Sequence, residues 1–515
     1  MKISMIRGNL IGVKVVENDR QPSEWLNEKI AKELLDLIPR SFALEHTVIP
    51  IRRDSNNQLH VAINNPFNFS ALNDLRLKTG MLIIPQKANG ADIHQAIIRE
   101  YPSEININEF GDGEIEAETN EEQEDTPIIK LVNSLIQEAI NHQASDIHFD
   151  PQKKFVSVRM RVDGVLREIE KLPKNIQPSV NSRLKIISDL DITENRVPQD
   201  GSAQMKTGKR IIDLRLSILP TIHGEKVVIR IMDRSIGIRN LEDFNFKKER
   251  LVLFRQLLAQ PHGIILVTGP TGSGKSSTLY AALNELNDPK RNLITVEDPV
   301  EYQLGGINQV AVNASIGMTF SSTLRAMLRQ DPDIIMVGEI RDSETAEIAI
   351  RASMTGHLVL STIHTNDSVT TISRLIDMEI PPFLVANSLT GILSQRLVRT
   401  VCQNCKTAYP ISEEEKVILN RYGRTSEQLY RGQGCVKCAY TGYAGRIAIQ
   451  ELLIVTAAMR KMITENVNSD EMIRYLKQKG MPFLADDAID KVIAGFTTIE
   501  EGMKIIATEG SLVNE

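Results

Sequence analysis

Hydrophobic and polar residues follow two different periods along the chain, and the changes of period divide it into regions. Apolar side chains recur every three or four residues between residues 128 and 140, which predicts a helix with one buried face. Shorter apolar runs follow up to residue 232 and predict strands, with turns at Asp163-Gly164 and His223-Gly224. This region is expected to form a domain of its own.

One strand of this domain carries an arginine whose side-chain direction can be predicted. Residues 212–219 alternate between polar and apolar, so Leu214 and Leu216 share one face and Arg215 lies on the other. The arginine is therefore expected to point away from the core of its own domain.

The remaining regions differ in pattern and in charge. Strands and helices alternate from about residue 240 onward, the order that gives a parallel sheet covered by helices. The first hundred residues predict a small α+β domain, and residues 111–125 hold eight acidic and no basic residues, the composition of a solvated linker. The expected boundaries are 1–104 for the first domain, 105–127 for the acidic linker, 128–238 for the second domain, and 239–515 for the C-terminal domain, including a cysteine-bearing subdomain at 396–448.

The strongest motif lies where one apolar strand meets a helix. The segment Gly269-Pro-Thr-Gly-Ser-Gly274-Lys275-Ser276 matches the phosphate-binding P-loop pattern without a mismatch; a flexible glycine–serine loop is the alternative. Backbone N–H groups of such a loop surround phosphate oxygens, Lys275 brings a charge to the β- and γ-phosphates, and the Ser276 hydroxyl can ligate Mg²⁺. Lys275 is expected to be exposed and to contribute little to packing. The predicted ATP-binding residues are Gly269, Pro270, Thr271, Gly272, Ser273, Gly274, Lys275, Ser276 and Ser277.

Three later strands end in acidic or histidine residues, which open α/β sheets use at their catalytic edge. These residues are Glu297, Glu339 and His364. Asp333 begins the strand that Glu339 follows, about 20 Å away at roughly 3.3 Å per residue, so Glu339 is the better candidate for the carboxylate that acts on Mg²⁺ or water. For His364 a purely structural role stays open.

Two arginines, Arg325 and Arg329, are four residues apart on an expected helix and should share one face. They either contact phosphate or form a solvated charged face.

Charge and hydrophobicity restrict the partners and the location of the chain. The net charge is −6, and no dense basic block with interleaved aromatic residues is present, which argues against nucleic acid as a partner. The apolar runs are far shorter than the roughly 18 residues that span a bilayer, and we expect no signal peptide. A cytoplasmic protein is therefore expected.

All four cysteines form two C-x₂-C pairs, Cys402/Cys405 and Cys435/Cys438. Four thiolates at this spacing suit tetrahedral Zn²⁺ and leave no position open for water, which predicts a structural metal site. A vestigial zinc site and a redox pair are the alternatives, although a redox pair would not need two copies.

The motifs and their order along the chain resemble those of the hexameric secretion-superfamily ATPases of type II secretion and type IV pilus assembly. The resemblance covers residues from about 128 to the C-terminus and, more loosely, the first hundred through IPRSFALEHTVIPI and LHVAINNPFN. It rests on the P-loop, the tetracysteine and the segments ASDIHFD, RMRVDG, VPQDG, RLS, GEKVVIRI, ITVEDPVEY, RQDPDIIMVGEIRD and TGHLVLSTIHTND.

The resemblance implies an α/β fold in which a RecA-like P-loop NTPase core follows a PAS-like α+β domain and a small N-terminal docking domain, with the tetracysteine as an insertion. It further implies a homohexamer that cleaves ATP between the C-terminal domain of one subunit and the N-terminal domain of its neighbour, with Arg215 and Arg230 reaching the phosphates. Some pilus-assembly relatives bind a cyclic dinucleotide through an N-terminal motif that this sequence does not contain.

The implied partners are an inner-membrane platform protein and the cytoplasmic domain of a membrane assembly protein, which would recruit the chain to the cytoplasmic face of the bacterial inner membrane. The expected function is ATP hydrolysis coupled to assembly of a type IV pilus or a type II secretion pseudopilus. Retraction motors generally lack the tetracysteine, which favours extension or secretion. A nucleic-acid motor with a RecA-like core and an ATP-binding scaffold are the alternatives.

Overall fold

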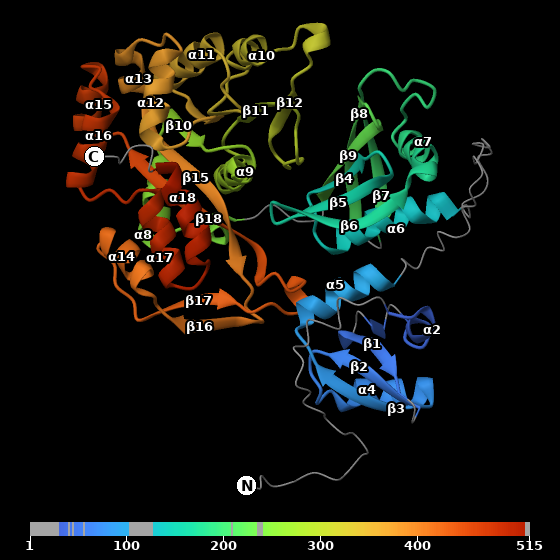
Figure 1. Ribbon diagram of the computed structural model, residues 1–515. Helices are drawn as coiled ribbons and strands as arrows, with labels where there is room; N and C mark the ends of the chain where they lie inside the picture. The colour runs from blue at the N-terminus through green and yellow to red at the C-terminus, as the bar shows by residue number, and fades with distance from the viewer. Residues whose placement is uncertain are drawn as a thin grey trace. The chain divides into compact units, whose positions relative to one another are not determined.

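The chain forms two compact units, which are described separately (Figure 1). Unit 1 comprises Met1–Ser235 and Gln433–Gly442, and unit 2 comprises Ile236–Gly432 and Tyr443–Glu515. The acidic linker, up to residue 126, and the domain boundary expected at residue 238 lie outside the described residues. The computed structural model describes residues 30–39, 42–43, 46–54, 57–101, 127–207, 210–233 and 240–509.

The first part of unit 1 is the small α+β arrangement expected from its mixed pattern. Its sheet has the order β1-β2-β3, with an antiparallel β1–β2 pair and a parallel β2–β3 pair. The elements are α2 (Lys32–Leu35), β1 (Val48–Arg53), β2 (Gln58–Ile63), α4 (Phe69–Thr79), β3 (Leu82–Lys87) and α5 (Gly90–Glu100).

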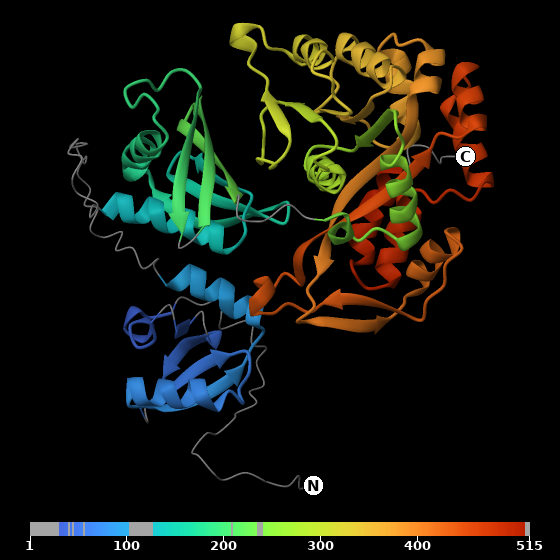
Figure 2. The ribbon, with the colours of Figure 1, turned by 180° about the vertical axis from the view of Figure 1, so that it is seen from behind.

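The second part of unit 1 is a six-stranded antiparallel sheet whose apolar face packs against two helices (Figure 2). The sheet order is β6-β5-β4-β9-β8-β7. The hairpin expected at Asp163-Gly164 is confirmed, because Val162 pairs with Val165. The elements are α6 (Pro127–Asn141), β4 (Asp146–Pro151), β5 (Phe155–Val162), β6 (Val165–Pro173), α7 (Gln177–Ile187), β7 (Gln199–Thr207), β8 (Arg210–Thr221) and β9 (Gly224–Asp233).

The alternation predicted in β8 is also confirmed. Leu214 and Leu216 are each 2% exposed in the core of this part, whereas Arg215 between them is half-buried on the opposite face.

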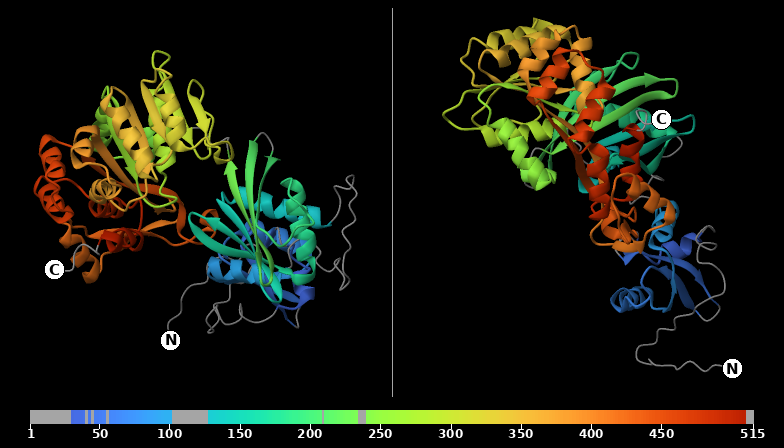
Figure 3. Two further views of the ribbon diagram at one scale, coloured as in Figure 1. Left: turned by 90° about the horizontal axis from the view of Figure 1, so that it is seen from above. Right: turned by 90° about the vertical axis from the view of Figure 1, so that its left-hand side faces the viewer.

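Unit 2 is built on a seven-stranded sheet of order β12-β11-β13-β14-β10-β15-β18, parallel except for β18 (Figures 1 and 3). Alternate residues of β10 enter two different cores. Ile264 and Leu266 pack with helices on one face, and Ile265 and Val267 pack with α8 and α9 on the other. A strand buried on both faces needs the continuous apolar run that the sequence carries. The expected α/β fold is therefore present.

The strands of unit 2 are β10 (Gly263–Thr268), β11 (Leu293–Glu297), β12 (Asn308–Ala311), β13 (Ile334–Val337), β14 (Leu358–Ile363), β15 (Leu389–Val401), β16 (Lys406–Pro410), β17 (Gln428–Gly432) and β18 (Tyr443–Ile454). The helices are α8 (Lys248–Leu258), α9 (Lys275–Leu286), α10 (Phe320–Met327), α11 (Ser343–Met354), α12 (Ser368–Asp377), α13 (Pro382–Ser388), α14 (Glu413–Arg421), α15 (Ala457–Thr464), α16 (Ser469–Gln478), α17 (Leu484–Ile493) and α18 (Ile499–Glu509). Among the described helices, none has both the length and the apolar character needed to cross a bilayer.

The segment between β15 and β18 carries the cysteines and shares a hydrophobic core with the last two described helices of the chain. Leu419 of α14 and Leu429 of β17 are almost fully buried against apolar residues of α17 and α18. From the sequence, which is poor in large apolar residues here, we expect little besides a metal to hold this segment together. That expectation is wrong for α14 and β17, which are packed on α17 and α18.

Candidate active site

Four neighbouring strands of unit 2 deliver the predicted catalytic groups to one edge of the sheet. The P-loop follows β10, Glu297 ends β11, Glu339 follows β13, and His364 follows β14. Because the sheet order is β11-β13-β14-β10, His364 comes from the strand between those that carry Glu339 and the P-loop. Asp333 immediately precedes β13 and lies at the opposite end, as expected.

The P-loop has a backbone that glycine permits and that a neighbouring strand supports. Gly269, Gly272 and Gly274 have φ values of 144°, 77° and 85°, in the range that L side chains rarely adopt. A Cβ on Gly269 would lie 2.2 Å from the backbone oxygen of Gln395 on β15. The close approach of β15 therefore requires glycine at this position.

Gln395 itself is a support that the motif did not reveal. Its Nε2 donates to the Ser273 carbonyl at 2.8 Å, and its Oε1 accepts from the Thr278 hydroxyl of α9 at 2.9 Å. The side chain is fully buried and joins the P-loop to the helix that follows it. The pairing of β10 with β15, in which Ile264 lies beside Leu389, brings this side chain to the loop from a distant part of the sequence.

Lys275 is not an exposed loop residue, which corrects the expectation from the sequence. It is the first residue of α9, is only 8% exposed, and donates to the Gly269 and Pro270 carbonyls at 2.8 and 3.1 Å. Burial lowers the pKa of the ammonium group, and the charge of Glu339 acts in the opposite direction. The lysine thus ties the start of the loop to its end.

Serine hydroxyls complete the loop. Ser273 is 3% exposed, and its Oγ is buried without a hydrogen-bond partner in the described part of the chain. A buried hydroxyl without a partner fits a position beside a ligand. Ser276 and Ser277 are exposed at the start of α9, where the backbone N–H groups also favour an anion.

Glu339 and His364 form a pair beside the P-loop. Glu339 is paired with Arg341 and with His364 Nε2 at 3.2 Å, and its side chain is 14% exposed. The side chain of His364 is half exposed. Together they place a carboxylate and an imidazole within reach of water at the sheet edge.

Glu297 differs from Glu339 in being enclosed by hydrogen-bond donors. It is 5% exposed and accepts hydrogen bonds from the hydroxyls of Tyr280 and Thr295 and from Gln309 Nε2. Burial and the charge of Glu297 raise the pKa of Tyr280 well above its usual value. Glu297 therefore anchors α9 and β12 to the end of β11, and Glu339 is the more accessible carboxylate.

The arginine pair of α10 does not share one helix face, because the helix ends at Met327, before Arg329 and ahead of Asp331-Pro332. Arg325 Nη1 pairs with Glu344 at 2.7 Å, and Arg329 Nη1 donates to the carbonyl of Arg325 at 2.9 Å. These contacts are typical of a solvated surface, and a phosphate contact stays a prediction.

In unit 1, two predicted arginines meet in a surface hollow of about 540 Å³. Arg215 of β8 and Arg230 of β9 are directly opposite each other in the sheet. Like charges in this arrangement repel, and Asp146 compensates in part through Arg230 Nε at 3.4 Å. A concave surface with two guanidinium groups is suited to an anionic ligand.

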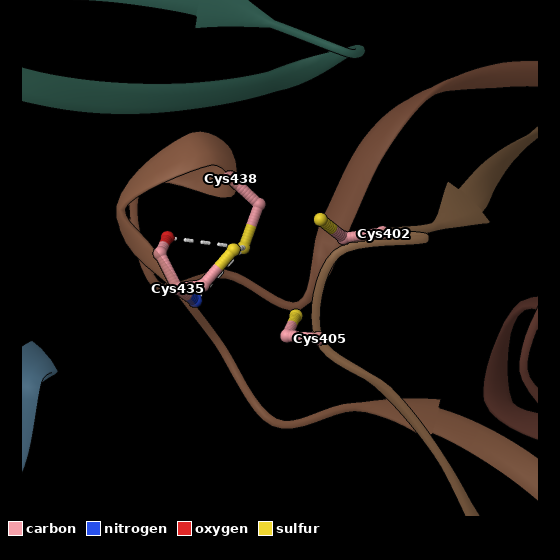
Figure 4. A group of neighbouring side chains, drawn as sticks. All are labelled: Cys402, Cys405, Cys435 and Cys438. Carbon is pink, nitrogen blue, oxygen red and sulfur yellow. Dashed lines mark hydrogen bonds between the residues drawn. The ribbon is translucent and has the colours of Figure 1, made fainter.

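The four cysteines gather into one cluster, whose sulfur atoms all lie within 4.8 Å of one another (Figure 4). Cys435 and Cys438 have their sulfurs 3.7 Å apart, and none of the four thiols is in a disulfide. At a Zn–S distance of about 2.3 Å, the edge of a tetrahedron of sulfurs is about 3.8 Å. The donor set and its spacing fit a four-coordinate metal.

Two family models match the chain. The model described as type II/IV secretion system protein matches residues 121–504, and the MshEN domain model matches residues 26–106.

Relatives and solved structures agree with these matches. The type II secretion system ATPase E of Vibrio cholerae is 48% identical over 385 residues, which are 75% of this chain and 76% of that protein. The type IV pilus assembly ATPase PilB of Myxococcus xanthus is 41% identical over 493 residues, 92% of this chain and 86% of that protein. The crystal structure of the pilus retraction motor PilT with bound ADP has a TM-score of 0.50 at 27% identity and covers 72% of this chain and 96% of its own.

Proposed function

Because this chain belongs to the family of type II/IV secretion system proteins, we propose that it is the ATPase that powers assembly of a type IV pilus or of a type II secretion pseudopilus. The observation that carries the proposal is the grouping of the P-loop, Glu339 and His364 at adjacent strand ends of one sheet. Type II secretion ATPases and type IV pilus assembly ATPases match this chain at similar sequence identity, so the proposal includes both systems.

The chain's own residues have distinct roles in this proposal. Backbone N–H groups of the P-loop and the start of α9 bind the phosphates of ATP, and Lys275 transfers its hydrogen bonds from the two loop carbonyls to phosphate oxygens. Glu339, held by Arg341 and His364, orients the attacking water. Mg²⁺, held through the Ser276 hydroxyl, would neutralise charge on the β- and γ-phosphates.

The complete site is proposed to form between subunits of a homohexamer. Arg215 and Arg230 line a hollow on unit 1 that suits an anion, and the family resemblance implies that the P-loop of a neighbouring subunit would bring the nucleotide to them. The small N-terminal domain would bind the cytoplasmic domain of a membrane assembly protein and bring the ring to an inner-membrane platform protein. The chain would thus act in the cytoplasm at the face of the bacterial inner membrane.

The carboxylates give the direct test of hydrolysis. Glu339→Gln is expected to lower steady-state phosphate release at least about tenfold while ATP binding changes little, because the amide keeps the shape but cannot act as a base. Glu297→Gln is expected to lower hydrolysis similarly and also to lower the melting temperature, because its amide would face the donors of Tyr280 and Thr295.

Asp333→Asn is the matched control, since it changes a carboxylate at the opposite end of the strand that leads to Glu339. It should hydrolyse ATP at nearly the wild-type rate. Equal hydrolysis by wild type and Glu339→Gln would remove Glu339 from the mechanism, and a wild type without hydrolysis would favour an ATP-binding scaffold.

We also propose that the cysteine cluster holds one structural Zn²⁺ per chain. Chelation should unfold the cysteine loops, residues 402–405 and 435–442, while α14 stays folded because Leu419 and Leu429 are packed on α17 and α18. Elemental analysis would give the stoichiometry, and hydrogen exchange with and without chelator would locate the change. Protein purified without chelator that contains no metal would leave a thiol pair as the better interpretation.

A further inference from the structure

Residues His364–Ser368, which connect β14 to α12 and include the first residue of that helix, are held along their length by polar contacts, and we call them the histidine loop. His364 contacts Glu339, the Thr365 N–H donates to the Thr268 hydroxyl at 3.1 Å, and Asn366 Oδ1 accepts from Arg396 Nη2 at 3.1 Å. Asp367 caps α12 by accepting from Thr370 N at 2.7 Å. Thr268 directly precedes the P-loop. The histidine loop therefore contacts both Glu339 and the strand end from which the P-loop starts.

The last contact of the histidine loop is to a carboxylate that is fully buried in unit 2. Glu451 of β18 is 0% exposed. Its Oε1 accepts from both the N–H (3.1 Å) and the hydroxyl of Ser368, and its Oε2 accepts from the Leu484 N–H at 3.1 Å. Ser368 and Leu484 are the first residues of α12 and α17, where the N–H groups have no partner within the helix. One carboxylate thus fastens the starts of two helices.

We propose that Glu451 is a positioning residue for ATP hydrolysis, which holds the histidine loop in register with Glu339 and the P-loop as long as its side chain is ionised. The proposal rests on the ATPase function proposed above. Three donors point at the two carboxylate oxygens, and the ionised form, which carries acceptors only and a negative charge, binds all three more strongly than the protonated form does. Protonation converts one oxygen to a donor and so weakens the contact with one of the two helices.

This switch falls near neutral pH. Burial raises the pKa of Glu451 to about 7, Asp367 at the start of α12 adds to the rise, and the hydrogen bonds from Ser368 and Leu484 oppose it. The other elements packed on β18 bring charges that have partners of their own. On α17, Asp486 accepts a hydrogen bond from the N–H of Phe483, and Asp487 forms ion pairs with Arg250 and Lys491. On β15, Arg396 donates to the side chain of Asn366.

The raised pKa has opposite consequences for activity and for stability. The ionised, positioning form is the minority species at pH 6 and the majority species at pH 8, so its contribution to kcat should rise several-fold between them. The unfolded chain has a glutamate pKa of about 4.3, so the folded state binds more protons between pH 4.3 and 7. Stability from this group is therefore full below pH 4.3 and falls as the pH rises to 7.

The test compares the pH dependence of ATP hydrolysis in full-length wild type and in Glu451→Gln. The amide is neutral at every pH, so kcat at pH 8 should fall several-fold and the rise between pH 6 and 8 should be lost. Other ionisable groups contribute equally to both profiles, and the difference between the two profiles isolates Glu451. Glu501→Gln is the matched control, because Glu501 is also buried but binds Arg399 and Lys504; it should keep the wild-type profile.

A second variant decides the question if Glu451→Gln fails to fold. Ser368→Ala removes one hydroxyl donor that lowers the pKa of Glu451, so the midpoint of the rise in kcat should move to higher pH. A purely structural contact would change the melting temperature without moving that midpoint. If wild type hydrolyses ATP and both variants keep its pH profile, the role of Glu451 is wrong; if wild type does not hydrolyse ATP, the proposed function fails instead.

Discussion

Replacing Lys275 by alanine is expected to reduce ATP turnover at least about a hundredfold and to lower stability at the same time. The turnover falls because the lysine charge is proposed to act on the transferring phosphoryl group, where single donors are worth about 10²–10³ in rate. Stability falls because the ammonium group is buried and bonds two P-loop carbonyls, which lose a charged donor worth about 1.5–3 kcal/mol. Phosphate release and thermal unfolding measure the two effects separately.

Lys290→Ala provides the control for this pair of measurements. Lys290 is exposed in the loop between α9 and β11, so its loss should leave both turnover and melting temperature nearly unchanged. Turnover of Lys275→Ala close to that of wild type would remove the P-loop from the mechanism. A variant that is inactive but as stable as wild type would mean that the loop closes without the lysine.

Mixing two inactive variants, Lys275→Ala and Arg215→Ala, is expected to restore part of the ATPase activity. An arginine supplied by a neighbouring subunit can contribute about 10³–10⁵ in rate, so each variant alone should be nearly inactive. In a mixed ring, some interfaces would combine an intact P-loop with an intact Arg215. Arg230 lies directly opposite Arg215, and the two positive charges repel each other. A bound phosphate would reduce this repulsion, which favours anion binding at Arg215.

The mixing experiment needs proof that subunits exchange, which labelled chains can supply. Arg210→Ala is a useful control, because Arg210 lies on the same strand and pairs with Asp233; mixtures of Arg210→Ala with Lys275→Ala should show only the activity of the former. If verified exchange restores nothing in the Arg215 mixture, the arginine acts within its own chain or supports the fold.

Much of the site could be predicted because its functional groups lie just after the C-terminal ends of parallel strands. The P-loop, Glu339 and His364 each come directly after an apolar run, and parallel strands bring such positions to one edge. What the sequence did not reveal depends on distant pairing. Gln395 reaches the P-loop only because β15 lies beside β10, and Glu451 reaches α12 only because β18 returns antiparallel to β15.

Burial caused the other differences between expectation and structure. A lysine in a glycine-rich loop looks exposed in sequence, but Lys275 begins a helix and is enclosed by the loop it holds. The cysteine segment looks poor in apolar residues, but its Leu419 and Leu429 share a core with α17 and α18, which come later in the chain. Local patterns cannot report partners supplied by later segments.

The cysteine-bearing insertion begins and ends at neighbouring points of one sheet, since Val401 of β15 pairs with Tyr443 of β18. The length or sequence of such an insertion can change during evolution while the pairing of β15 with β18 is kept, because closing a longer loop costs little extra entropy. Its packing against α17 and α18 sets the condition for such a change. A descendant that lost the insertion would uncover Ala485, Ile489 and Val492, and selection would then replace them by polar residues. The polarity of this helix face should therefore indicate, across the family, which members carry the insertion.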